Sequence, residues 1–145
     1  MQSQLSIEID RPPAEVFECT LKNVSAWSLT CVEDEVLEEV PGGVGTSFRI
    51  VTEDRGQRME FHGVVTEQDE PVSSAAVMTG KQFDIEVWYY FEDLGGRTLV
   101  TQRSMVRGKG FFRVLFLLLG WAFKKSACKA QMAELESLKR YCESR

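Results

Sequence analysis

The stretch FDIEVWYYF, residues 83–91, shows the most regular alternation of side chains in this sequence. Every second position holds a large apolar or aromatic residue, namely Phe83, Ile85, Val87, Tyr89 and Phe91. Because successive side chains of a β-strand point to opposite faces, this period of two predicts a strand. One face of that strand is therefore built for a protein interior.

Six further segments, before and after this stretch, have the apolar alternation or the bounding turns of strands. Turns such as Gly80-Lys81 and Leu94-Gly95-Gly96-Arg97 separate them. The predicted strands cover residues 3–10, 33–40, 46–53, 59–67, 72–79 and 98–106, with 33–40 as an edge strand. Gly63 is predicted to mark a bulge or a bend. Strands that follow one another in this way predict an antiparallel meander.

Helix signals lie before and after the series of strands. Pro12-Pro13, with Glu15 close behind, suits the first turn of a short helix that follows the first strand. Residues 24–29, which include Trp27, form either a second short helix or an irregular turn. After Gly108-Lys109-Gly110 the chain is predicted to form one long helix without an internal proline.

The two halves of this long helix differ in character. The second half is amphipathic, and its apolar stripe consists of Cys128, Met132, Leu135, Leu138 and Cys142. The first half, Phe111 to Phe123, is apolar on all sides except for Arg113 and Gly120. It is too short for the roughly 20 residues that span a bilayer. We therefore expect it to be covered by the sheet, by a partner or by a membrane surface.

Length and composition fit a single globular domain over residues 1–145. Apolar residues make up 43% of the chain and charged residues 27%, which is close to the average for proteins with a packed core. The four cysteines form no C-x-x-C pair and are expected to be reduced. No basic segment followed by an apolar run opens the chain, so the cytoplasm is the expected location.

The sequence lacks the motifs that bind metals, phosphate groups or nucleic acids. The single histidine and the scattered cysteines do not have the spacing of a metal site. There is no glycine-rich phosphate loop and no alternation of basic and aromatic residues typical of nucleic-acid modules. We expect no metal, no cofactor and no nucleic-acid partner.

Charge is distributed unevenly along the chain. Residues 1–106 carry a formal charge of −11, and residues 107–145 carry +6. A basic helix of this kind is either a solvated face that complements an acidic body or a surface for an anionic partner such as a membrane.

Local features in a fixed order extend over nearly the whole chain. They are the junction from Ile7 to Phe17, Trp27 after the first helix, Val44-Gly45-Thr46, the hairpin from Gly95 to Thr101, and Leu138-Lys139. In this order they resemble the START-like superfamily, and within it the polyketide cyclase/dehydrase type, also called SRPBCC. The resemblance implies an α+β helix-grip fold. In it, a curved antiparallel sheet of about seven strands wraps around a long C-terminal helix, with two short helices after the first strand.

The same resemblance implies a cavity between the sheet and the long helix. Members of the superfamily use it for lipids, sterols, polyketides, hormones and quinones, and some of them catalyse cyclisation or dehydration. Most of the lining is expected to be apolar, with a few polar groups, which is the usual composition of a small-molecule pocket. The predicted ligand-binding residues are Trp27, Phe48, Ile50, Met59, Phe61, Phe83, Ile85, Val87, Tyr89, Phe91, Val100, Gln102 and Ser104.

The sequence shows no catalytic pair. By strand parity, His62 shares the outer face with Glu60, and Asp84 lies with Glu86 on the outer face of its own strand. Tyr89 is a weak candidate for a general acid. Otherwise its hydroxyl is an anchor at the rim of the pocket.

Three functions follow as alternatives. The leading hypothesis is the binding or transport of a hydrophobic small molecule, such as a lipid or a polyketide, without catalysis. The second is a cyclase/dehydratase-type enzyme that acts on a polyketide-like substrate. The third is a membrane-surface or partner-binding module that uses Phe111 to Phe123, and a homodimer face is another role for this segment.

Overall fold

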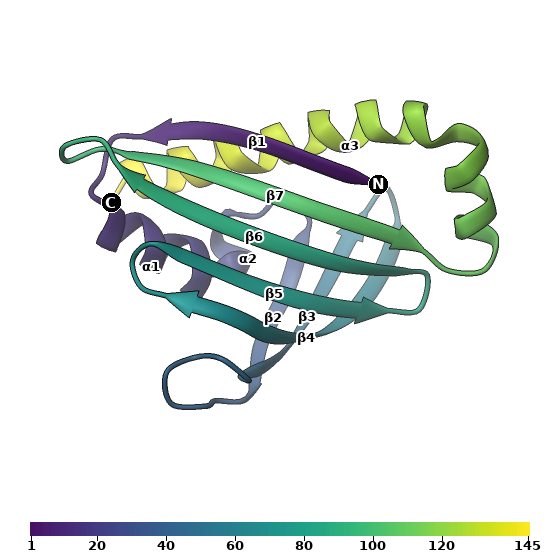
Figure 1. The fold of residues 1–145 in the computed structure, drawn as a ribbon, viewed down its shortest axis with the longest axis horizontal. Helices are drawn as coiled ribbons and strands as arrows, with labels where there is room; N and C mark the ends of the chain where they lie inside the picture. The colour runs from purple at the N-terminus through teal and green to yellow at the C-terminus, as the bar shows by residue number, and fades with distance from the viewer.

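The computed structural model describes residues 1–145 and contains one seven-stranded antiparallel sheet and three helices (Figure 1). The helix-grip fold class predicted from the sequence is confirmed. The strands are β1 (Gln2–Ile9), β2 (Cys31–Glu38), β3 (Ser47–Asp54), β4 (Gln57–Asp69), β5 (Ser73–Gly80), β6 (Phe83–Asp93) and β7 (Thr98–Gly108). The helices are α1 (Pro13–Lys22), α2 (Val24–Trp27) and α3 (Phe111–Glu143).

The sheet has the strand order β1-β7-β6-β5-β4-β3-β2. The chain therefore meanders from β2 to β7, and β1 joins the end of the meander by pairing with β7, with Ile7 opposite Val100. β2 lies at the other edge, as predicted. Figure 1 shows β5, β6 and β7 across the front and β2, β3 and β4 passing behind them, so the sheet is strongly curved.

Gly63 does not mark the irregularity in β4. It pairs regularly with Phe48 of β3, and the register shift lies farther along, between Val65 and Glu67. A Cβ atom at position 63 would overlap the ring of Phe48. The glycine therefore serves to make room for an aromatic side chain on the concave face, and the bulge predicted at Gly63 is wrong in position.

The main core occupies one end of the space between the sheet and the helices. Its buried members come from β1, β6, β7, the two short helices and the second half of α3. They are Ile9, Val16, Phe17, Trp27, Phe91, Val100, Leu135, Leu138 and Cys142. The spacing of Leu135, Leu138 and Cys142 puts them on one helical face, which explains why this half of α3 packs tightly. The other end of the concave face has no such filling.

α3 is not the continuous helix that the absence of proline predicted. Leu119 has non-helical angles, φ −125° and ψ 20°, so the helix is kinked there. The following residue is Gly120, whose low helix propensity makes such a break inexpensive. In Figure 1 the second half of α3 runs along β1, and the first half bends away at the far end of the sheet. No helix of the protein combines the length and the apolar content that crossing a membrane requires.

Candidate ligand-binding cleft

A large cleft lies on the concave face of the sheet, in the part that the core leaves unfilled. Its volume is about 1050 Å³. Strands β3 to β7 supply its wall, and α1, α2, the β2–β3 connection and Glu134 of α3 border it. Ligand pockets in proteins commonly have volumes of about 300–1,000 Å³. The cleft can therefore hold a sizeable small molecule.

Small residues on β5 keep this space open. The alternation of β6 directs Ile85, Val87 and Tyr89 into the cleft. Their neighbours across the strand pair include Ala76, opposite Val87, and Ser74, opposite Tyr89. Because these two side chains are short, they leave volume beside the larger groups of β6.

The structure brings nine of the predicted ligand-binding residues into the lining of this cleft. They come from β3, β4, β6, β7 and the short helix α2. They are Trp27, Phe48, Ile50, Phe61, Ile85, Val87, Tyr89, Gln102 and Ser104.

Four predicted residues lie outside the lining. Phe91 and Val100 are buried in the main core, where α1 and the second half of α3 cover them. Phe83 is covered by the first half of α3, because its ring lies 4.8 Å from that of Phe112 and 5.7 Å from that of Phe116, between centroids. Met59 lies two residues before Phe61 on β4, opposite Thr52 of β3, and is not among the lining residues. Strand parity predicts the face of a residue correctly but does not say which helix covers it.

A short hydrogen-bond network holds the polar side of the cleft. Gln102 Nε2 donates to the Tyr89 hydroxyl at 2.7 Å. Gln131 of α3 in turn donates to the backbone carbonyl of Gln102 at 3.0 Å, and Ser3 of β1 donates to Gln131 at 2.6 Å. Because the Tyr89 oxygen is used as an acceptor, its own proton is left to donate to a ligand.

Tyr89 is a neutral group at ordinary pH. Desolvation raises the pKa of its hydroxyl well above the usual value, and the negative charge of Glu134 adds to this effect. The hydrogen bond from Gln102 opposes it, with a smaller contribution than desolvation. Tyr89 can thus donate a hydrogen bond but gives up its proton reluctantly.

Glu134 is a member of the site that the sequence prediction missed. Its carboxylate accepts hydrogen bonds from the Ser28 hydroxyl at 2.6 Å and from the Leu29 backbone N–H at 2.7 Å. These bonds tie α3 to the corner between α2 and β2. A signal was present in the sequence, because Glu134 lies four residues before Leu138, on the buried side of the amphipathic half.

Cys31 and His62 do not form a catalytic pair with Tyr89 in the cleft. Burial, with help from the nearby carboxylate of Asp34, raises the pKa of the Cys31 thiol to about 11, so this lining residue is not a thiolate near neutral pH. His62 is exposed and lies 3.0 Å from Glu60 on the outer face, as strand parity predicted.

The fold and the cleft agree with the comparison to known families. The model of the family described as polyketide cyclase/dehydrase and lipid transport matches residues 2–143. The chain belongs to this family. Proteins of the family bind hydrophobic small molecules. No curated protein matches the sequence at a significant level.

Solved structures with low sequence identity share the fold of this family member. A START superfamily protein from Mycobacterium smegmatis is 18% identical, with a TM-score of 0.84 over 99% of this chain and 97% of that one. A protein from Thermus thermophilus is 17% identical, with a TM-score of 0.83 over 99% and 98%. The Zhui aromatase/cyclase from Streptomyces sp. R1128 is 14% identical, with a TM-score of 0.77 over 100% and 94%. At these identities the likeness shows the fold alone.

Proposed function

We propose that the protein binds and carries a hydrophobic small molecule, such as a lipid or a polyketide, in the cleft between the sheet and α3. The observation that carries the proposal is a mostly apolar cleft of about 1050 Å³ in which the proton of Tyr89 has no acceptor within the protein. Buried polar groups are normally satisfied, so an unused donor in an apolar wall suits a ligand that supplies the acceptor.

This chemistry favours a mainly apolar ligand with one carbonyl, hydroxyl or ether oxygen. The apolar body would contact Phe48, Ile50 and Val87, and the oxygen would accept the proton of Tyr89. A fully charged ligand would lose its hydration without gaining a countercharge from these side chains.

A cyclase/dehydratase-type enzyme is the alternative within the same family. It would need a group that moves a proton, and such groups work best when their pKa is near the operating pH. The pKa values of Tyr89 and Cys31 are both raised away from neutrality. The side chains of the cleft therefore support a binding role better than a catalytic one.

The experiment that tests the proposal fills the cleft with a larger side chain. In Val87→Trp we expect the binding of an uncharged naphthylamine dye, such as N-phenyl-1-naphthylamine, to fall by about tenfold or more, because the indole takes the place of the ligand. Dye fluorescence measures binding, and far-ultraviolet circular dichroism verifies the fold.

The matched control is Val77→Trp, which makes the same change on the outer face, where Val77 is 36% exposed. We expect this variant to bind the dye as the parent does. Equal dye binding by the Val87→Trp variant and the parent, both folded, would contradict the cleft as the ligand site.

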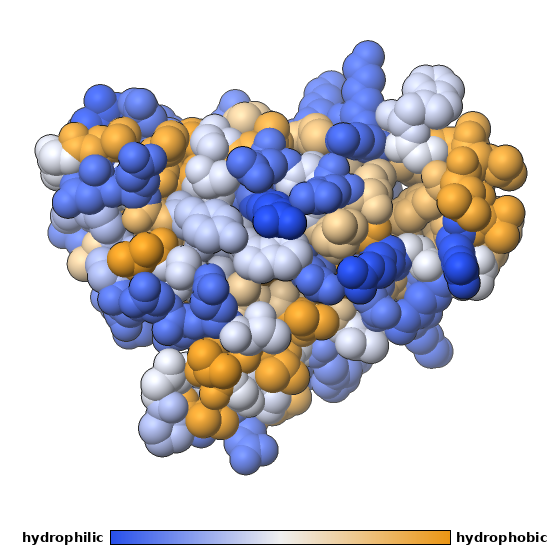
Figure 2. Space-filling model, viewed as in Figure 1, coloured by the Kyte–Doolittle hydropathy of each residue, from blue (hydrophilic) through white to orange (hydrophobic).

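We also propose that the start of α3 contacts an anionic membrane surface. Several of its apolar side chains are strongly exposed, among them Phe111 at 71%, Leu117 at 81% and Trp121 at 78%. Figure 2 shows apolar side chains gathered at the right-hand end of the molecule, where this half of α3 lies in Figure 1. Exposed apolar groups of this density mark interaction sites. The cytoplasmic location expected from the sequence stays a prediction.

A further inference from the structure

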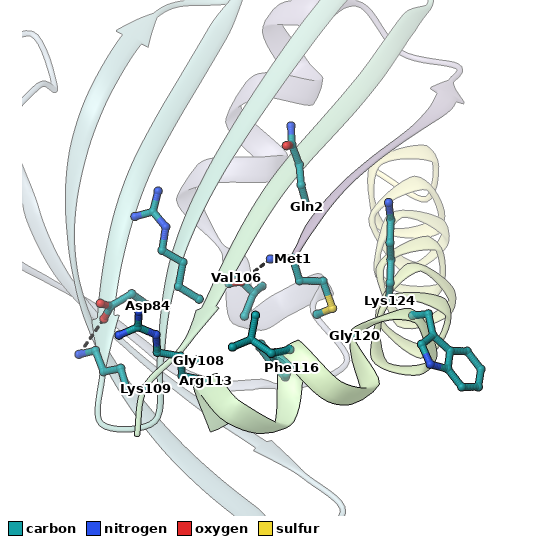
Figure 3. A pocket seen from close by; sticks show the side chains of 13 residues that line it. Met1, Gln2, Asp84, Val106, Gly108, Lys109, Arg113, Phe116, Gly120 and Lys124 are labelled. Carbon is teal, nitrogen blue, oxygen red and sulfur yellow. Dashed lines mark hydrogen bonds and ion pairs between the residues drawn. The ribbon is translucent and has the colours of Figure 1, made fainter. Parts of the chain in front are cut away.

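A second hollow lies where the end of β7 meets the bend of α3 (Figure 3). It has a volume of about 720 Å³ and shares no residue with the ligand-binding cleft. Its walls are the last residues of β7, the first residues of β1 and both halves of α3. We call it the hinge recess, with Arg107, Lys109, Arg113, Phe116, Trp121 and Lys124 as its defining residues.

The charge of the hinge recess is opposite to that of the protein as a whole. Four cationic side chains line it, against one carboxylate, that of Asp84, in a chain with a net charge of −5. Lys109 lies 2.9 Å from Asp84, as the dashed line in Figure 3 shows. Arg113 and Lys124 form no ion pair with any carboxylate of the protein. They are therefore available to an external anion.

The two free cations line the hinge recess from the two sides of the kink in α3. In a straight helix, positions 113 and 124 would be separated by about 16 Å along the axis, on nearly the same face. The bend at Leu119 folds the two halves around the hollow, with Arg113 on one and Lys124 on the other (Figure 3). The first turn of α3 holds no acidic residue, so the helix N-terminus adds its partial positive charge nearby.

Apolar side chains border the cations on the outer side. Phe116, Leu117 and Trp121 line the hinge recess, and Leu117 and Trp121 are also the most exposed apolar residues of the protein. Tryptophan is enriched at the boundary between lipid and water. A cationic hollow beside such groups suits an amphiphile whose anionic group enters the hollow while its chains stay outside.

We propose that the hinge recess binds the terminal phosphate of an anionic glycerophospholipid in a membrane, phosphatidic acid being the simplest example. A phosphate monoester offers three acceptor oxygens and close to two negative charges. The four cationic side chains that line the recess, two of them free of ion pairs, match this charge better than they match that of a lone carboxylate. This inference rests on the membrane contact proposed above and not on the ligand of the cleft.

The test uses the full chain and dihexanoyl phosphatidic acid below its micellar concentration, with binding measured by calorimetry. In Arg113→Gln/Lys124→Gln we expect the affinity to fall by about tenfold or more, because two charge-assisted donors are lost. The matched control is Lys125→Gln/Lys129→Gln, which removes the same charge from exposed positions outside the recess. It should retain the parent affinity within about twofold.

Vesicles then separate the recess from membrane contact in general. Phosphatidylcholine vesicles that contain phosphatidic acid should bind the protein more tightly than vesicles with phosphatidylserine at equal surface charge. The Arg113→Gln/Lys124→Gln variant should lose this preference and keep the weaker binding. Dye binding in the cleft should be unchanged in both double variants.

Three results would overturn the inference. If both double variants weakened the binding of phosphatidic acid equally, the attraction would be diffuse and electrostatic. The proposed membrane contact would then hold, but the hinge recess would not be a specific site. Displacement of the lipid by an equal concentration of inorganic phosphate would identify a site for free phosphate. Failure to bind either kind of vesicle would remove the membrane contact itself, and this proposal with it.

Discussion

Tyr89 and Gln102 determine which kind of ligand the cleft can recognise. Gln102 uses the tyrosine oxygen as an acceptor, so the tyrosine proton faces a wall that is otherwise mostly apolar. Because desolvation raises the pKa of Tyr89, this proton stays in place at neutral and moderately alkaline pH. The pair therefore provides one fixed donor, which selects for an oxygen atom at one place on a hydrophobic ligand.

Tyr89→Phe tests this donor at the scale of one residue. We expect the affinity for an apolar probe with a carbonyl group, such as an acyl-naphthalene dye, to fall by about fivefold, because one hydrogen bond contributes about 1 kcal/mol. Fluorescence titration measures the affinity. A naphthalene probe without a carbonyl should bind the variant and the parent equally. If the variant loses affinity for neither probe, the Tyr89 proton is not part of the site.

α3 combines two elements with different tasks. Its second half is amphipathic and buries Leu135 and Leu138 completely against β1 and the short helices. Its first half packs through Phe112 and Phe116 on Phe83 and leaves its other side in solvent. The kink at Leu119 separates the structural half from the half that is available for binding.

The same substitution should lower stability strongly in the second half of α3 and hardly at all in the first half. Leu135→Ala removes a fully buried side chain and should lower the free energy of unfolding by about 2–5 kcal/mol. Leu117→Ala changes a side chain that is 81% exposed and should stay within about 0.5 kcal/mol of the parent. Urea denaturation measures both. An equal loss in Leu117→Ala would show that the first half is covered in solution, for example by a second copy of the chain.

Charge is distributed unevenly over the whole molecule, with an acidic sheet and a basic C-terminal helix. Residues 1–106, which form most of the sheet, carry −11, and residues 107–145, mainly α3, carry +6. No acidic residue occurs from position 107 to position 133. An anionic membrane would therefore attract the end of the molecule that carries the exposed start of α3 and repel the acidic body. This sets the orientation of the membrane contact that we propose.

This charge distribution predicts salt-dependent binding to vesicles of phosphatidylcholine and phosphatidylserine. The protein should float with them at low ionic strength and be released at high salt, because the screening length falls from about 10 Å at 0.1 M to about 3 Å at 1 M. Leu117→Asp/Trp121→Asp should prevent binding. Val72→Asp/Leu94→Asp, which changes exposed residues at the other end of the sheet, should not.

A different result would assign the same surface to self-association. If the parent ignores the vesicles and sediments as a dimer that Leu117→Asp/Trp121→Asp converts to a monomer, the start of α3 is a homodimer face. Analytical ultracentrifugation at several protein concentrations makes this distinction.

Much of the fold and part of the cleft could be predicted from the sequence. The alternation in Phe83–Phe91 is a local property, because side chains of a strand alternate between two faces whatever the strand packs against. It correctly placed Ile85, Val87 and Tyr89 on the concave face. The same parity put His62 outside. The order of strands and helices then identified the helix-grip fold.

Only the tertiary structure decided how the concave face is divided. Phe91, Val87 and Phe83 have the same parity on one strand, yet the first is core, the second lines the cleft and the third lies under the start of α3. Their environments differ because α1 and the second half of α3 cover one end of β6, while the first half of α3, before the bend at Leu119, covers the other end. The tertiary structure likewise places Glu134 at the rim of the cleft, through its bonds to Ser28 and Leu29, and places Arg113 and Lys124 in the lining of one recess. No local period in the sequence records either arrangement.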